Sequence, residues 1–199
     1  MYLKLENFQP TGSFKVRGAL NSLLSLSEEQ RAKGVVAASS GNHGLAVAYG
    51  ASALGIGCEV FVPEHAPQTK TDAIRRLGGR LRHHGADVAV TESFARSHAL
   101  ENDKSYISPY NDIKVIGGQG TIALELGQQL DRIDAIYVAV GGGGLISGIA
   151  GYSKSVFDNP RIVGCLPENS PVMAESVRAG QIIDMESKPT LSDGTAGGI

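Results

Sequence analysis

The fold is decided at residues 35–44, whose sequence is VVAASSGNHG. Residues 35–38 are small and apolar, as in a short strand buried on both faces. Polar and glycine residues follow, and a helix of small residues is predicted from Asn42 to Leu54. A buried strand, a tight loop and a helix in this order form the repeating unit of a parallel sheet covered by helices.

The same alternation continues through the rest of the chain. A capping box at Ser27 predicts one further short helical turn, and Tyr2 to Leu5 alternate like a strand. The other predicted strands cover residues 58–62, 80–83, 105–108, 135–140 and 161–165, and the other predicted helices cover residues 13–24, 67–77, 92–101, 121–130, 145–157 and 172–179. We therefore expect an α/β protein with open parallel sheets. Residues 35–108 are predicted to form a small lobe inserted in a larger lobe built from residues 1–34 and 109–199.

Composition narrows the class of protein. The net charge is −2 and no basic patch occurs, so nucleic acid is not an expected partner. Apolar runs are far shorter than the roughly 20 residues that cross a bilayer, and no membrane association is expected. Cys58 and Cys165 are predicted to be free, buried thiols of a cytoplasmic protein. His83 and His84 are adjacent and would face opposite ways in a strand, so no metal site is predicted.

Gly141 to Gly144 follow a predicted strand and open a predicted helix. Such a turn points backbone N–H groups toward one spot at the positive end of a helix dipole, which suits a phosphate group. No P-loop lysine follows, which argues against a nucleoside triphosphate. A plain tight turn is the alternative. Gly118 to Ala123 match a loose dinucleotide-binding pattern, but no acidic residue ends the next strand.

Two further segments carry candidate chemistry. Residues 39–44 offer hydroxyl, amide and backbone donors suited to a carboxylate, although a simple helix cap explains them equally well. His43 is expected to be structural more readily than a general base. Lys15 lies between Phe14 and Val16 near a helix start, where desolvation and the helix dipole lower the pKa of an amine.

Three segments together, TGSFKVRGA at residues 11–19, SSGNHG at 39–44 and the four glycines at 141–144, complete a known pattern. The chain resembles the fold-type II pyridoxal-phosphate enzymes, specifically the threonine/serine dehydratase and serine racemase group. The resemblance covers essentially the whole chain. It implies a two-lobed fold like that of the tryptophan synthase β-subunit, here incomplete at both ends.

The resemblance also implies roles for single residues. Lys15 would form the Schiff base with pyridoxal 5′-phosphate, beside Phe14, and the Gly141, Gly142, Gly143 and Gly144 turn would hold the phosphate. Asn42 would contact the cofactor's phenolic oxygen. The substrate carboxylate would be bound by Ser39, Asn42 and His43, and Ser40 would face the substrate's α-carbon.

The implied reaction is β-elimination from L-threonine or L-serine, which yields a 2-oxo acid and ammonia. A serine or 3-hydroxyaspartate racemase, a specialised hydroxy-amino-acid dehydratase and a non-catalytic truncated relative are the alternatives. Tyr110 favours a dehydratase, because racemases of the group tend to have asparagine there. Ala174 stands where racemases place a cation-binding aspartate, six residues after Glu168. A homo-oligomer, either dimer or tetramer, is expected.

Overall fold

The computed structural model describes residues 1–199, apart from the side chain of Lys70. The chain forms two compact units, Met1–Gly118 and Gln119–Ile199, and the boundary between them falls inside one helix, α6 (Ile113–Gln129). The predicted lobes divide the chain at residues 35 and 109 instead, and that division stays a prediction.

The first unit is built on a four-stranded parallel sheet. Its strands are β1 (Val35–Ala38), β2 (Cys58–Val62), β3 (Arg80–His83) and β4 (Ser105–Tyr106), arranged in the order β3-β2-β1-β4. Strand β1 pairs with β2 from Val35 opposite Cys58, and with β4 from Val35 opposite Ser105. All pairings are parallel, which confirms the α/β fold class.

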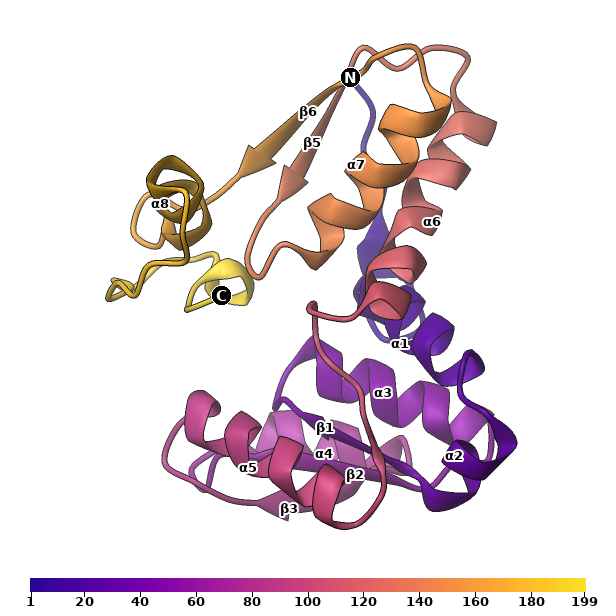
Figure 1. Ribbon diagram of the computed structural model, residues 1–199, viewed down its shortest axis with the longest axis vertical. Helices are drawn as coiled ribbons and strands as arrows, with labels where there is room; N and C mark the ends of the chain where they lie inside the picture. The colour runs from indigo at the N-terminus through magenta and orange to yellow at the C-terminus, as the bar shows by residue number, and fades with distance from the viewer. The chain divides into compact units, whose positions relative to one another are not determined.

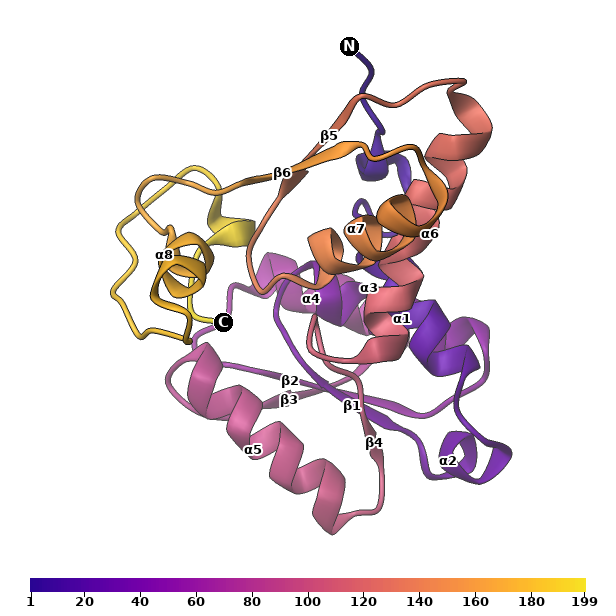
Figure 2. The same ribbon diagram turned by 45° about the horizontal axis from the view of Figure 1, so that its top comes forward.

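Helices cover both faces of this sheet (Figures 1 and 2). On one face, α1 (Lys15–Leu24), α3 (Asn42–Ala53) and α4 (Gln68–Arg76) pack over a core that includes Val35, Val60 and Leu23. On the other face, α5 (Val88–Glu101) covers Val36 and Phe61. Adjacent residues of β1 thus face opposite cores, which explains why the whole strand is buried and apolar.

Local signals set several helix boundaries. The predicted capping box is present at α2 (Glu28–Lys33), where Ser27 and Gln30 bond each other's backbone N–H groups. Helix α5 begins earlier than predicted, because the carboxylate of Asp87 accepts a hydrogen bond from the N–H of Val90. Asp87 therefore acts as the N-cap.

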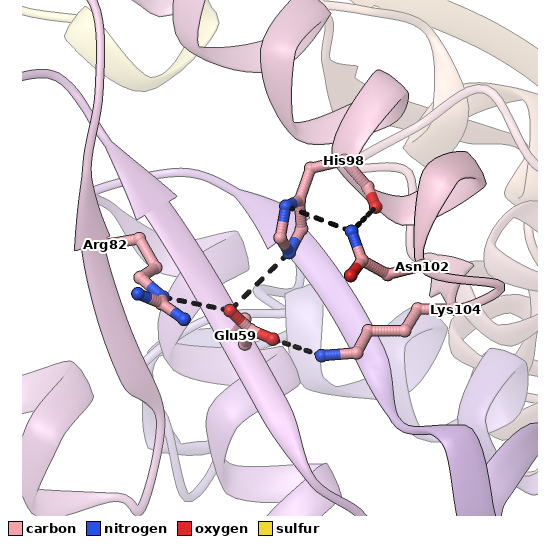
Figure 3. Close-up of polar contacts among 5 residues, drawn as sticks. All are labelled: Glu59, Arg82, His98, Asn102 and Lys104. Atoms are coloured by element: carbon pink, nitrogen blue, oxygen red, sulfur yellow. Dashed lines mark hydrogen bonds and ion pairs between the residues drawn. The ribbon is translucent and has the colours of Figure 1, made fainter.

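A charged network lies between the sheet and α5 (Figure 3). Glu59 of β2, with a side chain only 9% exposed, accepts a hydrogen bond of 2.9 Å from Arg82 of β3 and pairs with Lys104, which precedes β4. His98 of α5 places its Nε2 atom 3.6 Å from the same carboxylate. One carboxylate thereby connects two strands, a helix and a loop.

The second unit contains two parallel strands, β5 (Ala135–Ala139) and β6 (Arg161–Cys165). Helix α7 (Gly144–Val156) follows β5, and α8 (Val172–Ala179) follows β6. The chain closes with a 3-10 turn at Asp193–Thr195; another, at Glu6–Phe8, lies in the first unit. Within the part of the chain that is described, no helix is long and apolar enough to cross a membrane.

Three local predictions were wrong. Tyr2 to Leu5 form no strand, and Leu3 and Leu5 are exposed. The helix predicted from residue 121 begins at Ile113, so the glycines at 117–120 lie inside α6. Glycine there lets other helices approach closely: a Cβ on Gly118 would lie 2.5 Å from the carbonyl oxygen of Arg17. Cys165 is free as predicted but exposed, because β6 is exposed at this end, at Gly164 and Cys165.

Candidate functional site

The candidate residues of the first unit gather beyond the carboxyl ends of β1 and β4. These strands are neighbours and parallel, so the loops that follow them leave the same edge of the sheet. The loop after β1 holds Ser39, Ser40 and Gly41, and the segment after β4 runs through Ile107 and Pro109. Figure 2 shows α1 and α3 lying above this sheet.

Lys15 is the first residue of α1, and its side chain reaches the segment after β4. Its Nζ atom donates a hydrogen bond of 2.7 Å to the carbonyl oxygen of Pro109 and lies 5.5 Å from the centre of the Phe14 ring. Burial lowers the pKa of Lys15 to about 8, because water solvates the ammonium poorly there. An appreciable fraction of the amine is therefore neutral just above neutral pH, as a nucleophile or proton acceptor requires.

His43 lies in the first turn of α3 and is only 3% exposed. Its Nε2 atom is 2.8 Å from the carbonyl oxygen of Ile107. Burial, together with the positive charge of Lys15, lowers the pKa of His43 to about 3, so the ring is neutral at physiological pH. The side chain is thus engaged with the backbone, and the N–H groups at the start of α3 are the donors that this turn can offer to a carboxylate.

The loop from Ser39 to Gly44 is tightly folded. The hydroxyl of Ser39 accepts a hydrogen bond of 3.1 Å from the N–H of Gly41. A Cβ atom on Gly44 would collide with the carbonyl oxygen of Ser39, so only glycine permits this turn. Ser40 is half-buried, and Asn42 is exposed at the first position of α3. The loop therefore presents polar groups from a rigid backbone.

The four glycines of the second unit form the turn between β5 and α7. Gly143 has a φ of +85° and precedes the first residue of α7. A Cβ atom on Gly141 would lie 3.3 Å from the Cα atom of Thr195, so the backbone of this turn runs close to a neighbouring segment. The turn leaves the first N–H groups of α7 without helical acceptors, which is the arrangement that favours an anion.

The structure brings most of the predicted site residues into one unit. Phe14, Lys15, Ser39, Ser40, Asn42 and His43 belong to the first unit, and Gly141 to Gly144 belong to the second. No group of three or more His, Cys, Asp or Glu side chains in the described part of the chain is arranged to hold a metal ion.

Comparison with known proteins agrees with this arrangement. The family description "Pyridoxal-phosphate dependent enzyme" matches residues 1–199. The chain belongs to this family of pyridoxal-phosphate dependent enzymes. Its cofactor is accordingly pyridoxal 5′-phosphate.

Relatives within the family have more than one activity. The chain is 43% identical to the L-threonine ammonia-lyase of Thermotoga maritima over 98% of this chain and 49% of that protein. It is 44% identical to a serine racemase of Arabidopsis thaliana over 98% of this chain and 59% of that one. The structure of threonine deaminase isoform 2 from Solanum lycopersicum superposes with a TM-score of 0.94 at 38% identity, covering 98% of this chain and 57% of the other. The chain thus spans about half the length of the curated relatives it matches.

Two features of this structure fit the family's cofactor. The half-buried amine of Lys15, with its lowered pKa, suits reaction with an aldehyde, and the glycine turn before α7 suits a phosphate group. Sequence reasoning missed the carbonyl groups of Ile107 and Pro109, which hold His43 and Lys15. Backbone acceptors carry no residue signature, so only the expected strand ending near residue 108 pointed toward them.

Proposed function

We propose that the protein is an ammonia-lyase that converts L-threonine or L-serine to a 2-oxo acid and ammonia. The observation that carries the proposal is the Lys15 amine, half-buried at the carboxyl edge of the sheet and held at 2.7 Å by Pro109. The likeness to the threonine ammonia-lyase of Thermotoga maritima supports it. A small amino acid is the expected substrate, and a cytoplasmic homo-oligomer is the expected form of the protein.

Each candidate residue has a proposed role. Lys15 carries the cofactor and later takes the proton from the substrate's α-carbon, which its lowered pKa of about 8 favours. When bound, the cofactor withdraws electrons from that carbon and so stabilises the negative charge left behind. Gly141 to Gly144 bind the phosphate through backbone N–H groups.

The loop after β1 is proposed to orient the substrate. Ser39, Asn42 and the backbone N–H of His43 bind the carboxylate at the positive end of α3, where the helix dipole favours an anion. Asn42 would also hydrogen-bond the phenolic oxygen of the bound cofactor, and Phe14 would lie beside its ring. Ser40 is proposed to face the α-carbon, where its hydroxyl is a candidate second proton carrier.

A serine racemase is the second candidate, favoured by the 44% identity to the Arabidopsis enzyme. Both reactions begin with removal of the α-proton by the same lysine, so the geometry at Lys15 serves either one. They differ in the second step: elimination expels the β-hydroxyl, whereas racemisation returns a proton to the opposite face of the α-carbon. Ser40 bears on that difference, because a racemase needs a proton donor opposite the lysine.

The test begins with cofactor loading. Protein incubated with pyridoxal 5′-phosphate should turn yellow, borohydride should fix the label on Lys15, and Lys15→Ala should abolish both. Lys154, an exposed lysine of α7, provides the matched control, and Lys154→Ala should load normally. A wild-type protein that stays colourless would favour a non-catalytic relative.

Product analysis then separates the activities. Ammonia release should be measured with L-threonine, L-serine, 3-hydroxyaspartate and D-serine, and the stereochemistry of recovered serine should be determined. Ammonia from L-threonine or L-serine, with recovered serine still in the L form, supports the lyase. Accumulation of D-serine with little ammonia would replace it by the racemase, and a preference for 3-hydroxyaspartate would indicate a specialised dehydratase.

A further inference from the structure

We propose that the side chain of His43 is a positioning residue for Lys15, acting through the backbone of residues 107–109. The inference deepens the proposed function, because it assigns the side chain of His43 a task that does not involve touching the substrate. Its basis is a chain of contacts that lies entirely in the first unit.

The first contact determines which ring nitrogen of His43 carries the proton. A carbonyl oxygen can only accept, so the 2.8 Å contact with Ile107 places the proton of His43 on Nε2. The Nδ1 atom is then a bare acceptor, and it is buried with no hydrogen-bond partner among the described side chains and backbone. With its pKa near 3, the ring keeps this single donor over the whole physiological range.

Further contacts restrict the movement of residues 107–109, the segment to which the ring is hydrogen-bonded. Ile107 is 1% exposed, and its N–H donates to the carbonyl oxygen of Val36 at 2.8 Å, which extends the ladder between β1 and β4. Ser108 is 3% exposed, and its hydroxyl accepts from the N–H of Asn111 at 3.0 Å. The ring of Pro109 restricts φ, so little freedom remains between the carbonyl of residue 107 and that of residue 109.

The third contact transfers this rigidity to the amine. The carbonyl oxygen of Pro109 accepts from Lys15 Nζ at 2.7 Å. This acceptor keeps the amine in its half-buried place, and that place is the cause of the lowered pKa. If the segment were released, the long lysine side chain could turn toward water and its pKa would return toward the ordinary value. His43 therefore controls the protonation of Lys15 without titrating itself.

Two substitutions separate the donor from the volume of the ring. In His43→Gln, the side-chain amide can place an N–H near the position of Nε2, which preserves the bond to Ile107. In His43→Leu, the volume is similar but no donor remains. His43→Asn provides a third case, because its shorter amide stays polar but cannot reach the same carbonyl.

The measurement is the pH profile of Lys15 acylation in the cofactor-free protein. Trace labelling with acetic anhydride followed by peptide mass spectrometry gives the reactivity of Lys15 relative to Lys154 in the same sample. The midpoint for wild type is expected at about 8. His43→Leu and His43→Asn should raise it toward 10.5, and His43→Gln should keep it near the wild-type value. Cofactor trapping by borohydride at pH 8 should fall in the first two variants, because less of the amine is neutral; a midpoint raised by one pH unit lowers the neutral fraction about fivefold.

A purely structural role would give a different result. Unfolding by urea is measured for each variant, and a general loss of stability would not move the profile of Lys15 relative to Lys154. If His43→Leu does not fold, His43→Asn against His43→Gln gives the same comparison. The proposal is overturned if the Lys15 midpoint is the same in wild type and both donor-lacking variants, or if His43→Gln moves with them. Because labelling needs no cofactor, the outcome is independent of whether the wild type loads or turns over.

Discussion

Replacing Glu59 with glutamine removes the central charge of the network in Figure 3 and keeps the shape of the side chain. Burial by itself would raise the pKa of this carboxyl group. Hydrogen bonds from Lys104 and Arg82 outweigh that effect and lower the pKa from 4.5 to about 2. The folded state thus binds the proton of Glu59 more weakly than the unfolded state does.

The size of the effect comes from this difference. A pKa of about 2 in place of 4.5 corresponds to about 3 kcal/mol of stability at neutral pH. This value is an upper limit for Glu59→Gln, since Arg82 is 42% exposed and Lys104 is 24% exposed, and both cations can regain water. We expect a loss of about 2 kcal/mol at pH 7.

The lowered pKa also sets the sign of the pH dependence. The stabilisation by Glu59 is fully present above about pH 4.5 and is lost as the pH falls toward 2. Urea unfolding of wild type and Glu59→Gln should therefore differ at pH 7 and converge at low pH. Glu29→Gln is the matched control, because Glu29 is 77% exposed and pairs with Lys33 on the surface, where about 0.5 kcal/mol is expected. A loss for Glu59→Gln that is no larger than that of the control, or that persists unchanged to low pH, would refute the reasoning.

Three further predictions concern helices and the buried amine. Gly118→Ala should lower the free energy of unfolding, measured in urea, by about 1–3 kcal/mol, because the added Cβ would lie 2.5 Å from a backbone oxygen. Gly117→Ala in the same helix is the control: its Cβ would lie 3.7 Å from the nearest atom, so it should be neutral or stabilising. Equal effects of the two substitutions would contradict this. Lys15→Met should stabilise the cofactor-free protein by up to about 3 kcal/mol at pH 7, because it removes a buried ammonium. This gain should shrink above pH 8 and vanish above 10.5, where the amine is neutral in both the folded and the unfolded state. A gain that does not change with pH would argue against a desolvated ammonium. Ser27→Ala should destabilise helix α2 by about 1 kcal/mol, which should appear as faster amide hydrogen exchange in Glu28–Lys33. Unchanged exchange would argue against the capping box.

Elements with strong local signals could be predicted from the sequence. Strand β1 and strand β2 have the predicted bounds, and the capping box at Ser27 is present. The apolar run of β1 is too short for a helix, and the serine before α2 has a glutamine three residues later, so both signals lie within a few residues of the chain. Predictions failed where the deciding partner lies far along the chain. Gly118 lies inside a helix and lacks a side chain because Gly18 packs against it, and local sequence cannot show that contact.

The residues of the candidate site and of the Glu59 network also differ in how far the sequence could predict them. The resemblance pointed to Lys15, and the structure adds the desolvation and the acceptor that make this amine unusual. The neighbours of Glu59 could not be predicted, because Arg82 and Lys104 lie 23 and 45 residues away in the chain. An isolated glutamate in an apolar strand gives no sign of which cations will neutralise it.

The helix that carries Lys15 is held by positions that have no side chain. Gly50 of α3 leaves room for Leu23, and Gly118 of α6 leaves room for the backbone at Arg17 and Gly18. An α-helix is stiff over one turn, so a displacement at Arg17 shifts the amine two residues earlier by a similar amount. Mutational libraries aimed at a new substrate range should therefore leave these two glycines unchanged, because an added methyl group there would misplace the reactive nitrogen without changing any candidate site residue.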